Sequence, residues 1–171
     1  MVVLDASPLI VLAKIRRLNL IHGLYREALI GKVVHKEVVE QGRAISAPGL
    51  EQVERALEER WLRTVSLAAS EREWMRRALK RLRIDEGEAE ALALARNRGF
   101  LLVVDDKEAR AAAAAFGVSY TGTVGVLLEA MMSGFLGGDE FEDTITQVSR
   151  VMWLSPAVVA EALRRAREWK R

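Results

Sequence analysis

The sequence predicts a parallel α/β fold, and three observations support that fold class. Short apolar runs that are typical of buried strands alternate with stretches whose apolar residues have helical spacing. Two of these runs end in carboxylates, with Asp5 after residues 1–4 and Asp105 and Asp106 after residues 101–104. The 171 residues are enough for one full hydrophobic core and few for two, so we expect a single domain.

Five short segments are predicted strands, because each is apolar or alternates between apolar and polar residues. They are residues 1–4, 28–30, 61–66, 100–104 and 118–120. The first strand turns through Ala6-Ser7-Pro8 into a helix, and Gly31 ends the second.

The stretches between these strands have apolar residues at helical spacing. The predicted helices cover residues 9–17, 18–27, 33–41, 51–60, 70–82, 84–95 and 109–115. Gly42 is a natural stop for the third helix and Ser70 a cap for the fifth. Residues 41–50, with two glycines and a proline, are the clearest loop, and the chain beyond residue 121 is again helical with breaks near Gly137 and Pro156.

Glutamates on two predicted helices fall on different sides of the helical wheel. Glu37 lies on the apolar side of its helix, where an unpartnered carboxylate is costly to bury. Glu88 lies in the middle of an apolar stripe, whereas Glu90 is about 200° further round and is expected to face water. Asp85 is close enough in angle to reach the same place as Glu88, and Glu86 is expected to serve only the helix N-terminus.

The acids follow the order strand, helix, helix, strand in an alternating chain. This order implies parallel strands whose carboxyl ends converge, which is where ligands bind in open α/β sheets. An alternative stays open for Asp5 and for the pair of Asp105 and Asp106, because an Asp after a strand is also a common helix N-cap. For Thr121 and Thr123, after the last strand, simple capping is favoured over contact with a substrate.

Composition limits the kind of site that these acids can form. The chain has no cysteine and only two histidines, so a bound metal would need oxygen ligands. Crowded carboxylates repel one another unless a cation neutralises them, and the hard cations Mg²⁺ and Mn²⁺ prefer oxygen. The net charge is +2, with basic clusters at residues 16–17, 72–83 and 164–171. Such clusters suit a polyanion, although solvated helix faces are the favoured explanation of any single cluster.

No apolar run approaches the length that crosses a bilayer. The N-terminus also lacks the basic leader and uninterrupted apolar stretch of a signal peptide, since Asp5 and Pro8 interrupt it. We therefore expect a cytoplasmic protein without a membrane partner.

Five motifs together resemble a PIN domain and are most similar to the VapC-like branch of small prokaryotic PIN proteins. They are Leu4-Asp5-Ala6-Ser7-Pro8-Leu9-Ile10, His35-Lys36-Glu37-Val38-Val39, Gly87-Glu88-Ala89-Glu90-Ala91, Val103-Val104-Asp105-Asp106-Lys107 and Thr121-Gly122-Thr123. The resemblance covers residues 1–135. Residues 136–171 are then a helical C-terminal extension packed on the same domain.

The resemblance implies a three-layer α/β/α sandwich with a central parallel sheet and a Mg²⁺- or Mn²⁺-dependent ribonuclease. Asp5 matches the first metal-binding acid and Glu37 the second, while Glu88 stands where the family usually has Asp. Asp106 best matches the fourth acid, and Asp105 competes for that role. The candidate substrate contacts are Ser7, Thr121 and Thr123. Many relatives are homodimers and the toxin half of a toxin–antitoxin pair, so RNA, an antitoxin and a second copy are the expected partners.

Other parallel α/β classes fit less well. A haloacid-dehalogenase-like site needs a second Asp two residues after the first, where this chain has Ser7. A receiver domain needs its acidic pair near the first strand, and no glycine-rich phosphate loop follows that strand for a nucleotide. The main alternative is a non-catalytic PIN-fold module that binds RNA or a protein. Retention of all four acids argues against it, because a carboxylate cluster without an ion is destabilising.

Overall fold

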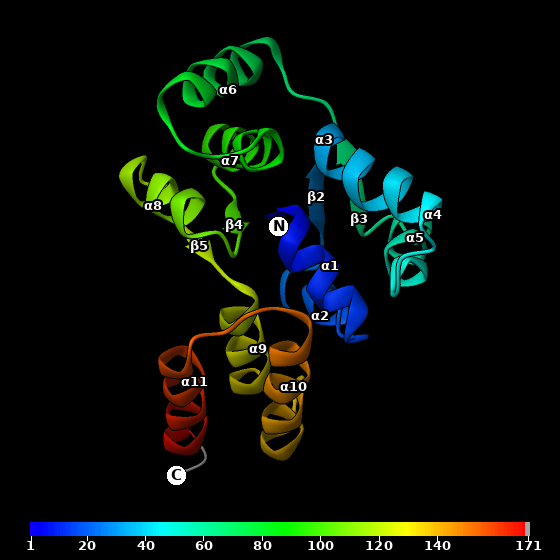
Figure 1. Cartoon of the computed structure of the whole chain (residues 1–171), viewed down its shortest axis with the longest axis vertical. Helices are drawn as coiled ribbons and strands as arrows, with labels where there is room; N and C mark the ends of the chain where they lie inside the picture. The colour runs from blue at the N-terminus through cyan, green and yellow to red at the C-terminus, as the bar shows by residue number, and fades with distance from the viewer. Residues whose placement is uncertain (170–171) are drawn as a thin grey trace.

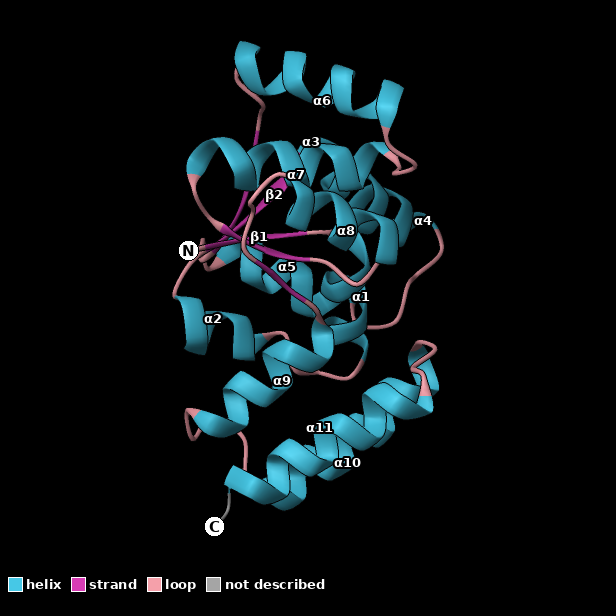
Figure 2. Ribbon diagram, turned by 90° about the vertical axis from the view of Figure 1, so that its left-hand side faces the viewer, coloured by secondary structure: helices cyan, strands magenta, loops and turns pink. Residues whose placement is uncertain are grey.

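The computed structural model describes residues 1–169 and contains a parallel five-stranded sheet with helices on both faces (Figures 1 and 2). The strands are β1 (Val2–Leu4), β2 (Ala28–Gly31), β3 (Leu62–Val65), β4 (Leu101–Val103) and β5 (Tyr120–Thr121). Their order across the sheet is β3-β2-β1-β4-β5, and every neighbouring pair is parallel. The predicted three-layer α/β/α sandwich is confirmed.

The central strand β1 lies where the strand order reverses. The chain proceeds from β1 to β2 and β3 on one side, then returns to place β4 and β5 on the other. Leu4 pairs with Val103 across β1 and β4, and the backbone N–H of Asp5 donates to the Val103 carbonyl at 3.0 Å. The loops that follow β1 and β4 therefore start side by side and run in different directions. The crevice between two such loops is the usual ligand site of an open α/β sheet.

The helices alternate with the strands through most of the chain. Their bounds are α1 (Ala6–Lys14), α2 (Asn19–Tyr25), α3 (Lys32–His35), the π-helix η1 (Lys36–Gln41), α4 (Gly42–Ala44), α5 (Leu50–Glu58), α6 (Ala69–Arg81), α7 (Glu86–Arg98), α8 (Lys107–Ala115), α9 (Thr123–Met132), α10 (Gly138–Val151) and α11 (Pro156–Trp169).

Several predicted helix limits differ from the structure, and three of the differences have a clear local cause. The first helix begins at Ala6, because Pro8 falls in its first turn, where a proline is tolerated. Gly42 does not stop the third helix, since it keeps a right-handed φ of −58° and the helical path continues into α4. Ser70 is not the cap of α6, which begins at Ala69; the Glu71 carboxylate instead accepts the N–H of Ala68 at 2.6 Å.

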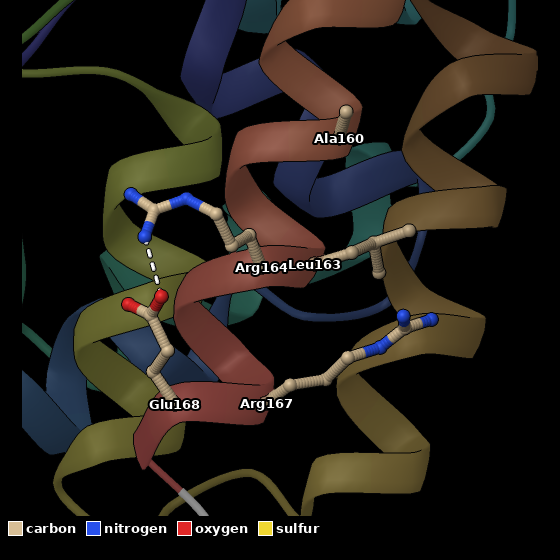
Figure 3. Close-up of a pocket in the computed structure, with 5 residues that line it drawn as sticks. All are labelled: Ala160, Leu163, Arg164, Arg167 and Glu168. Atoms are coloured by element: carbon tan, nitrogen blue, oxygen red, sulfur yellow. Dashed lines mark hydrogen bonds and ion pairs between the residues drawn. The ribbon is translucent and has the colours of Figure 1, made fainter.

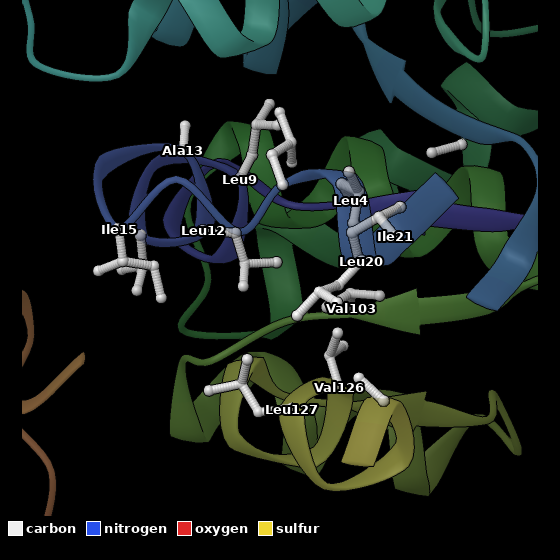
Figure 4. Packing of buried hydrophobic residues seen from close by; sticks show 14 of the residues in the cluster. Leu4, Leu9, Leu12, Ala13, Ile15, Leu20, Ile21, Val103, Val126 and Leu127 are labelled. Carbon is white, nitrogen blue, oxygen red and sulfur yellow. The ribbon is translucent and has the colours of Figure 1, made fainter. Parts of the chain in front are cut away.

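Side chains of the strands alternate between two hydrophobic clusters, as a pleated sheet requires. On one face, Leu4 and Val103 pack with residues of α1 and α9 such as Leu12 and Val126 (Figure 4). On the other face, strand residues such as Leu102 pack against α7 and α8. Both faces of the sheet are thus covered.

The C-terminal helices extend the layer beneath α9. Figure 2 shows α6, α7, the sheet, α9 and then α10 with α11 in sequence through the molecule. Phe141 and Ile145 of α10 and Ala162 of α11 are buried in the same cluster as Leu4. Within residues 1–169, no helix has the length and apolar character needed to cross a membrane.

Candidate active site

A hollow of about 510 Å³ opens at the carboxyl ends of β1 and β4. Its walls carry six carboxylates, which come from the ends of β1 and β4, from η1 and from the start of α7: Asp5, Glu37, Asp85, Glu88, Asp105 and Asp106. We call it the acidic pocket. It brings together every acid that the sequence proposed for catalysis or metal binding, and it includes Asp85, which the helical wheel placed near Glu88.

Asp5 is the most buried of these acids, with 4% of the residue exposed. Burial raises the pKa of its carboxyl from 3.8 to about 7, and the nearby carboxylates of Glu88 and Asp85 add to the rise. Backbone N–H groups of Ala6 and Ser7 oppose it only in part. The folded protein therefore disfavours the ionised form of the Asp5 carboxyl.

Asp85 and Glu88 hold each other at the N-terminus of α7. The Asp85 side chain accepts the N–H of Glu88 at 2.8 Å, and the Glu88 side chain accepts the N–H of Asp85 at 2.8 Å. This capping box satisfies two backbone donors at the helix start. Burial raises the pKa of Glu88, and Asp85, Asp106 and Glu37 raise it further by charge repulsion. Glu88 therefore faces the carboxylates of the pocket from a fixed helix end.

Glu37 reaches the pocket from the π-helical segment η1. Its side chain is exposed rather than turned inward as the helical wheel predicted, since the i→i+5 bonding of a π-helix changes the angular step between residues. A Cβ atom at Gly87 would lie 3.7 Å from Glu37 Oε2 and 3.4 Å from Asp85 Oδ1. Gly87 thus lies next to both carboxylates, at distances that are ordinary van der Waals contacts. Partial burial and the Asp85 charge raise the pKa of Glu37.

Asp105 and Asp106 have different surroundings, although both line the pocket. Asp105 accepts the backbone N–H of Thr123 at 2.7 Å and its hydroxyl at 2.6 Å, with one oxygen each. Asp106 is exposed and caps α8 by accepting the N–H of Ala109 at 2.9 Å through Oδ1. For Asp106 the two alternatives from the sequence are compatible, because the residue caps a helix and also lines the pocket.

A family model described as a PIN domain matches residues 1–168. The chain belongs to the PIN-domain family. The PIN fold is a nuclease fold, and the match continues through α10 and into α11. Comparison with curated proteins and with solved structures found no match.

The hydroxyl groups suggested as substrate contacts are placed differently in this PIN domain. Ser7 is exposed and lines the acidic pocket. Thr121 is half-buried and lines a neighbouring hollow. Thr123 is fully buried, and its hydroxyl is committed to Asp105, so it orients an acid instead of facing a substrate. The sequence offered no signal for this contact, which joins residues 18 positions apart.

The prediction that Glu90 faces water is wrong. Glu90 is 4% exposed, and its two oxygens accept the backbone N–H groups of Lys32 at 3.0 Å and Val33 at 2.8 Å. The helical wheel failed because α7 lies between the sheet, α6 and α3, so nearly all its sides are buried and no single apolar stripe marks the interior.

The donor set of the pocket fits a hard divalent cation, because every candidate ligand is a carboxylate oxygen. The carboxylates are not, however, close enough together to form a metal site as they stand. Among residues 1–169, no three His, Asp or Glu side chains lie in an arrangement that could hold a metal ion. The residues thus have suitable chemistry, but their side chains would have to approach one another more closely to ligate a cation.

Another hollow, of about 460 Å³, lies on α11 and shares no lining residue with the acidic pocket. Figure 3 shows that Arg164 turns toward Glu168 of the same helix, with which it forms an ion pair, while Arg167 extends separately. This part of the basic C-terminal cluster therefore behaves as a solvated helix face. Lys170 and Arg171 of that cluster lie outside the described residues.

Proposed function

We propose that this PIN domain is a metal-dependent endoribonuclease that hydrolyses RNA phosphodiester bonds in the acidic pocket. The observation that carries the proposal is the burial of Asp5 beside other carboxylates, which raises its pKa to about 7. A cluster that opposes its own ionisation gains stability from a bound cation. Because this cluster lies in an open pocket of a nuclease fold, we expect it to bind the cation and take part in catalysis.

Asp5, Glu88 and Asp106 are the proposed ligands of Mg²⁺ or Mn²⁺. When bound, such a cation lowers the pKa of a water molecule and stabilises charge on the leaving oxygen of the phosphodiester. Asp105 has both oxygens bound by Thr123, so its role is to hold the loop after β4 and support Asp106 beside it. This division of roles favours Asp106 over Asp105 as the fourth acid of the family pattern.

Glu37 is the proposed general base. Its carboxylate is exposed at the pocket and accepts no hydrogen bond within residues 1–169, so a water molecule or an RNA hydroxyl can reach it. Its raised pKa strengthens it as a proton acceptor near neutral pH. The π-helical conformation of η1 agrees with this role, because π-helical turns occur often at functional sites.

The finer placement in the VapC-like branch rests on the five motifs of the sequence. On the same basis we propose that the chain acts as the toxin of a toxin–antitoxin pair, with a homodimeric assembly and an antitoxin as protein partner. The competing function is a non-catalytic PIN module. It draws support from the arrangement of the carboxylates, which within residues 1–169 form no ready metal site.

Cleavage of labelled RNA by the purified protein tests the nuclease proposal. We expect cleavage with Mg²⁺ or Mn²⁺ and none with EDTA. Asp5→Asn should reduce the rate by on the order of 100-fold or more, as removal of a group that stabilises transition-state charge does. Asp143→Asn, on the exposed face of α10, is the matched control and should keep full activity. Binding of RNA without cleavage under every metal condition would favour the non-catalytic module.

A further inference from the structure

A third hollow, of about 750 Å³, adjoins the acidic pocket and shares Asp105, Asp106 and Met152 with it. One wall consists of α8, β5 and the start of α9, and the other consists of α11 and the connection before it. We call this hollow the α11 groove. Because the two hollows share carboxylates, a chain-like ligand in the α11 groove would continue directly into the acidic pocket.

Exposed aromatic side chains line the α11 groove. Trp153, in the connection between α10 and α11, is 81% exposed and has no aromatic or cationic partner within residues 1–169. Tyr120 of β5 is 37% exposed and also lines the groove. An exposed indole contributes no burial energy to folding, so its exposure is not explained by stability. Its flat face is available for stacking on a ligand.

Cations accompany these rings. Lys107 and Arg110 project from the first turn of α8, and neither forms an ion pair within the described residues. The Arg110 guanidinium lies over the Tyr120 ring, 5.5 Å from its centroid. Arg165 lines the opposite wall, where it pairs with Glu161 at 2.7 Å. The groove as a whole has as many carboxylates (Asp105, Asp106 and Glu161) as cations, but Lys107 and Arg110, which have no ion-pair partner in the described residues, gather beside Asp106, where the groove meets the acidic pocket.

We propose that the α11 groove holds a single strand of RNA, with a base stacked on Trp153 and the backbone phosphates beside Lys107 and Arg110. This inference rests on the proposed function and assigns the C-terminal helices a part in it. An exposed aromatic ring with cations near it is a common platform for a single strand, because each base offers a face for stacking and each phosphate a charge. Bases in a duplex are already stacked and do not reach such a ring. A strand that continues past Arg110 enters the acidic pocket at Asp105 and Asp106, which line both hollows.

Binding measured in EDTA separates this proposal from cleavage. The probe is a short fluorescent RNA of mixed sequence, single-stranded or annealed to its complement, followed by anisotropy. We expect Trp153→Ala to weaken single-strand binding by about tenfold, the usual effect of losing one stacked base. Trp153→Phe should retain most of the affinity. Trp169→Ala is the matched control, because Trp169, at the end of α11, is also exposed but lines neither hollow.

Arg110→Ala should weaken binding and reduce its dependence on salt, since one phosphate contact is lost. The proposal is overturned if wild type binds the duplex as well as the single strand, if it binds neither, or if Trp153→Ala binds like wild type. Binding that depends on Trp153 without any cleavage would support the groove proposal and contradict the nuclease proposal. Cleavage with an unchanged kcat/KM in Trp153→Ala would support the nuclease proposal and contradict the groove proposal. A protein partner of the groove would appear as loss of that partner's binding in Trp153→Ala with RNA binding intact, which also overturns the proposal.

Discussion

Glu90 of α7 accepts the backbone N–H of Val33 at the start of α3, with 2.8 Å between Oε2 and the nitrogen. The second oxygen accepts the N–H of Lys32 at 3.0 Å. The helical path that begins there continues through α3 into η1, which carries Glu37. A buried carboxylate on one helix thus anchors the segment that delivers a different carboxylate to the acidic pocket.

Glu90→Gln is expected to lower the free energy of unfolding by about 1–3 kcal/mol, because one charged acceptor of a buried backbone donor is lost. Glu86→Gln, an exposed acid one turn away on α7, should change it little. Chemical denaturation measures both. Equal stability of the two variants would contradict the anchoring role.

Gly31→Ala tests the same contact from the other side. A Cβ atom at Gly31 would lie 1.9 Å from Glu90 Oε2 and 2.1 Å from its Cδ, so the carboxylate would have to move. We expect a loss of stability of at least about 1 kcal/mol, as for overpacking of an interior. Combining the variant with Glu90→Ala should recover part of that loss in a denaturation series. A purely additive double variant would show that the two residues do not compete for space.

Asp5→Asn is expected to stabilise the metal-free protein at neutral pH. The folded-state pKa of Asp5 is about 7, above its ordinary 3.8, so the folded protein binds more protons than the unfolded chain between these values. The stability of wild type therefore falls as pH rises from about 4 to about 7, and Asn lacks this penalty. Tm values in EDTA at pH 5 and pH 8 should show the advantage of Asp5→Asn growing with pH. A constant difference would contradict it.

Mg²⁺ or Mn²⁺ is expected to raise the Tm of wild type and of Asp143→Asn but not of Asp5→Asn. A ligand at 100 times its Kd stabilises the folded state by about 2.7 kcal/mol. Titration of each metal in a thermal melt, with Ca²⁺ as an additional ion, gives the apparent Kd. An equal shift in Asp5→Asn would place the cation elsewhere.

Thr123→Val is expected to reduce cleavage more than stability. The change keeps the shape of the buried side chain but removes the hydroxyl that donates to Asp105 Oδ2, while the backbone N–H bond remains. Loss of this bond frees the loop that holds Asp106, and we expect about a tenfold drop in rate, typical of residues that orient metal ligands. Thr123→Ser should restore the rate. Unchanged kinetics in Thr123→Val would show that the hydroxyl has no orienting role.

Local patterns in the sequence determined the sheet and most of the acidic pocket. The apolar runs before Asp5 and Asp105 are strands in the structure, and their parallel pairing follows from the alternation of strands and helices. Periodicity and spacing carry this information, because each element's own residues set its period and its end. The same reasoning predicted that Asp5, Glu88 and Asp106 would lie at one edge of the sheet, and they line one pocket there.

Only the tertiary structure decided which side chains are buried and what they contact. Glu90 is buried because α3 covers the side of α7 that the helical wheel assigned to water. Thr123 donates to Asp105 because the start of α9 packs beside the end of β4. The α11 groove likewise forms between Trp153 and residues on α8 and β5. Contacts between residues far apart in the chain depend on how whole elements pack, and a period within one element does not encode them.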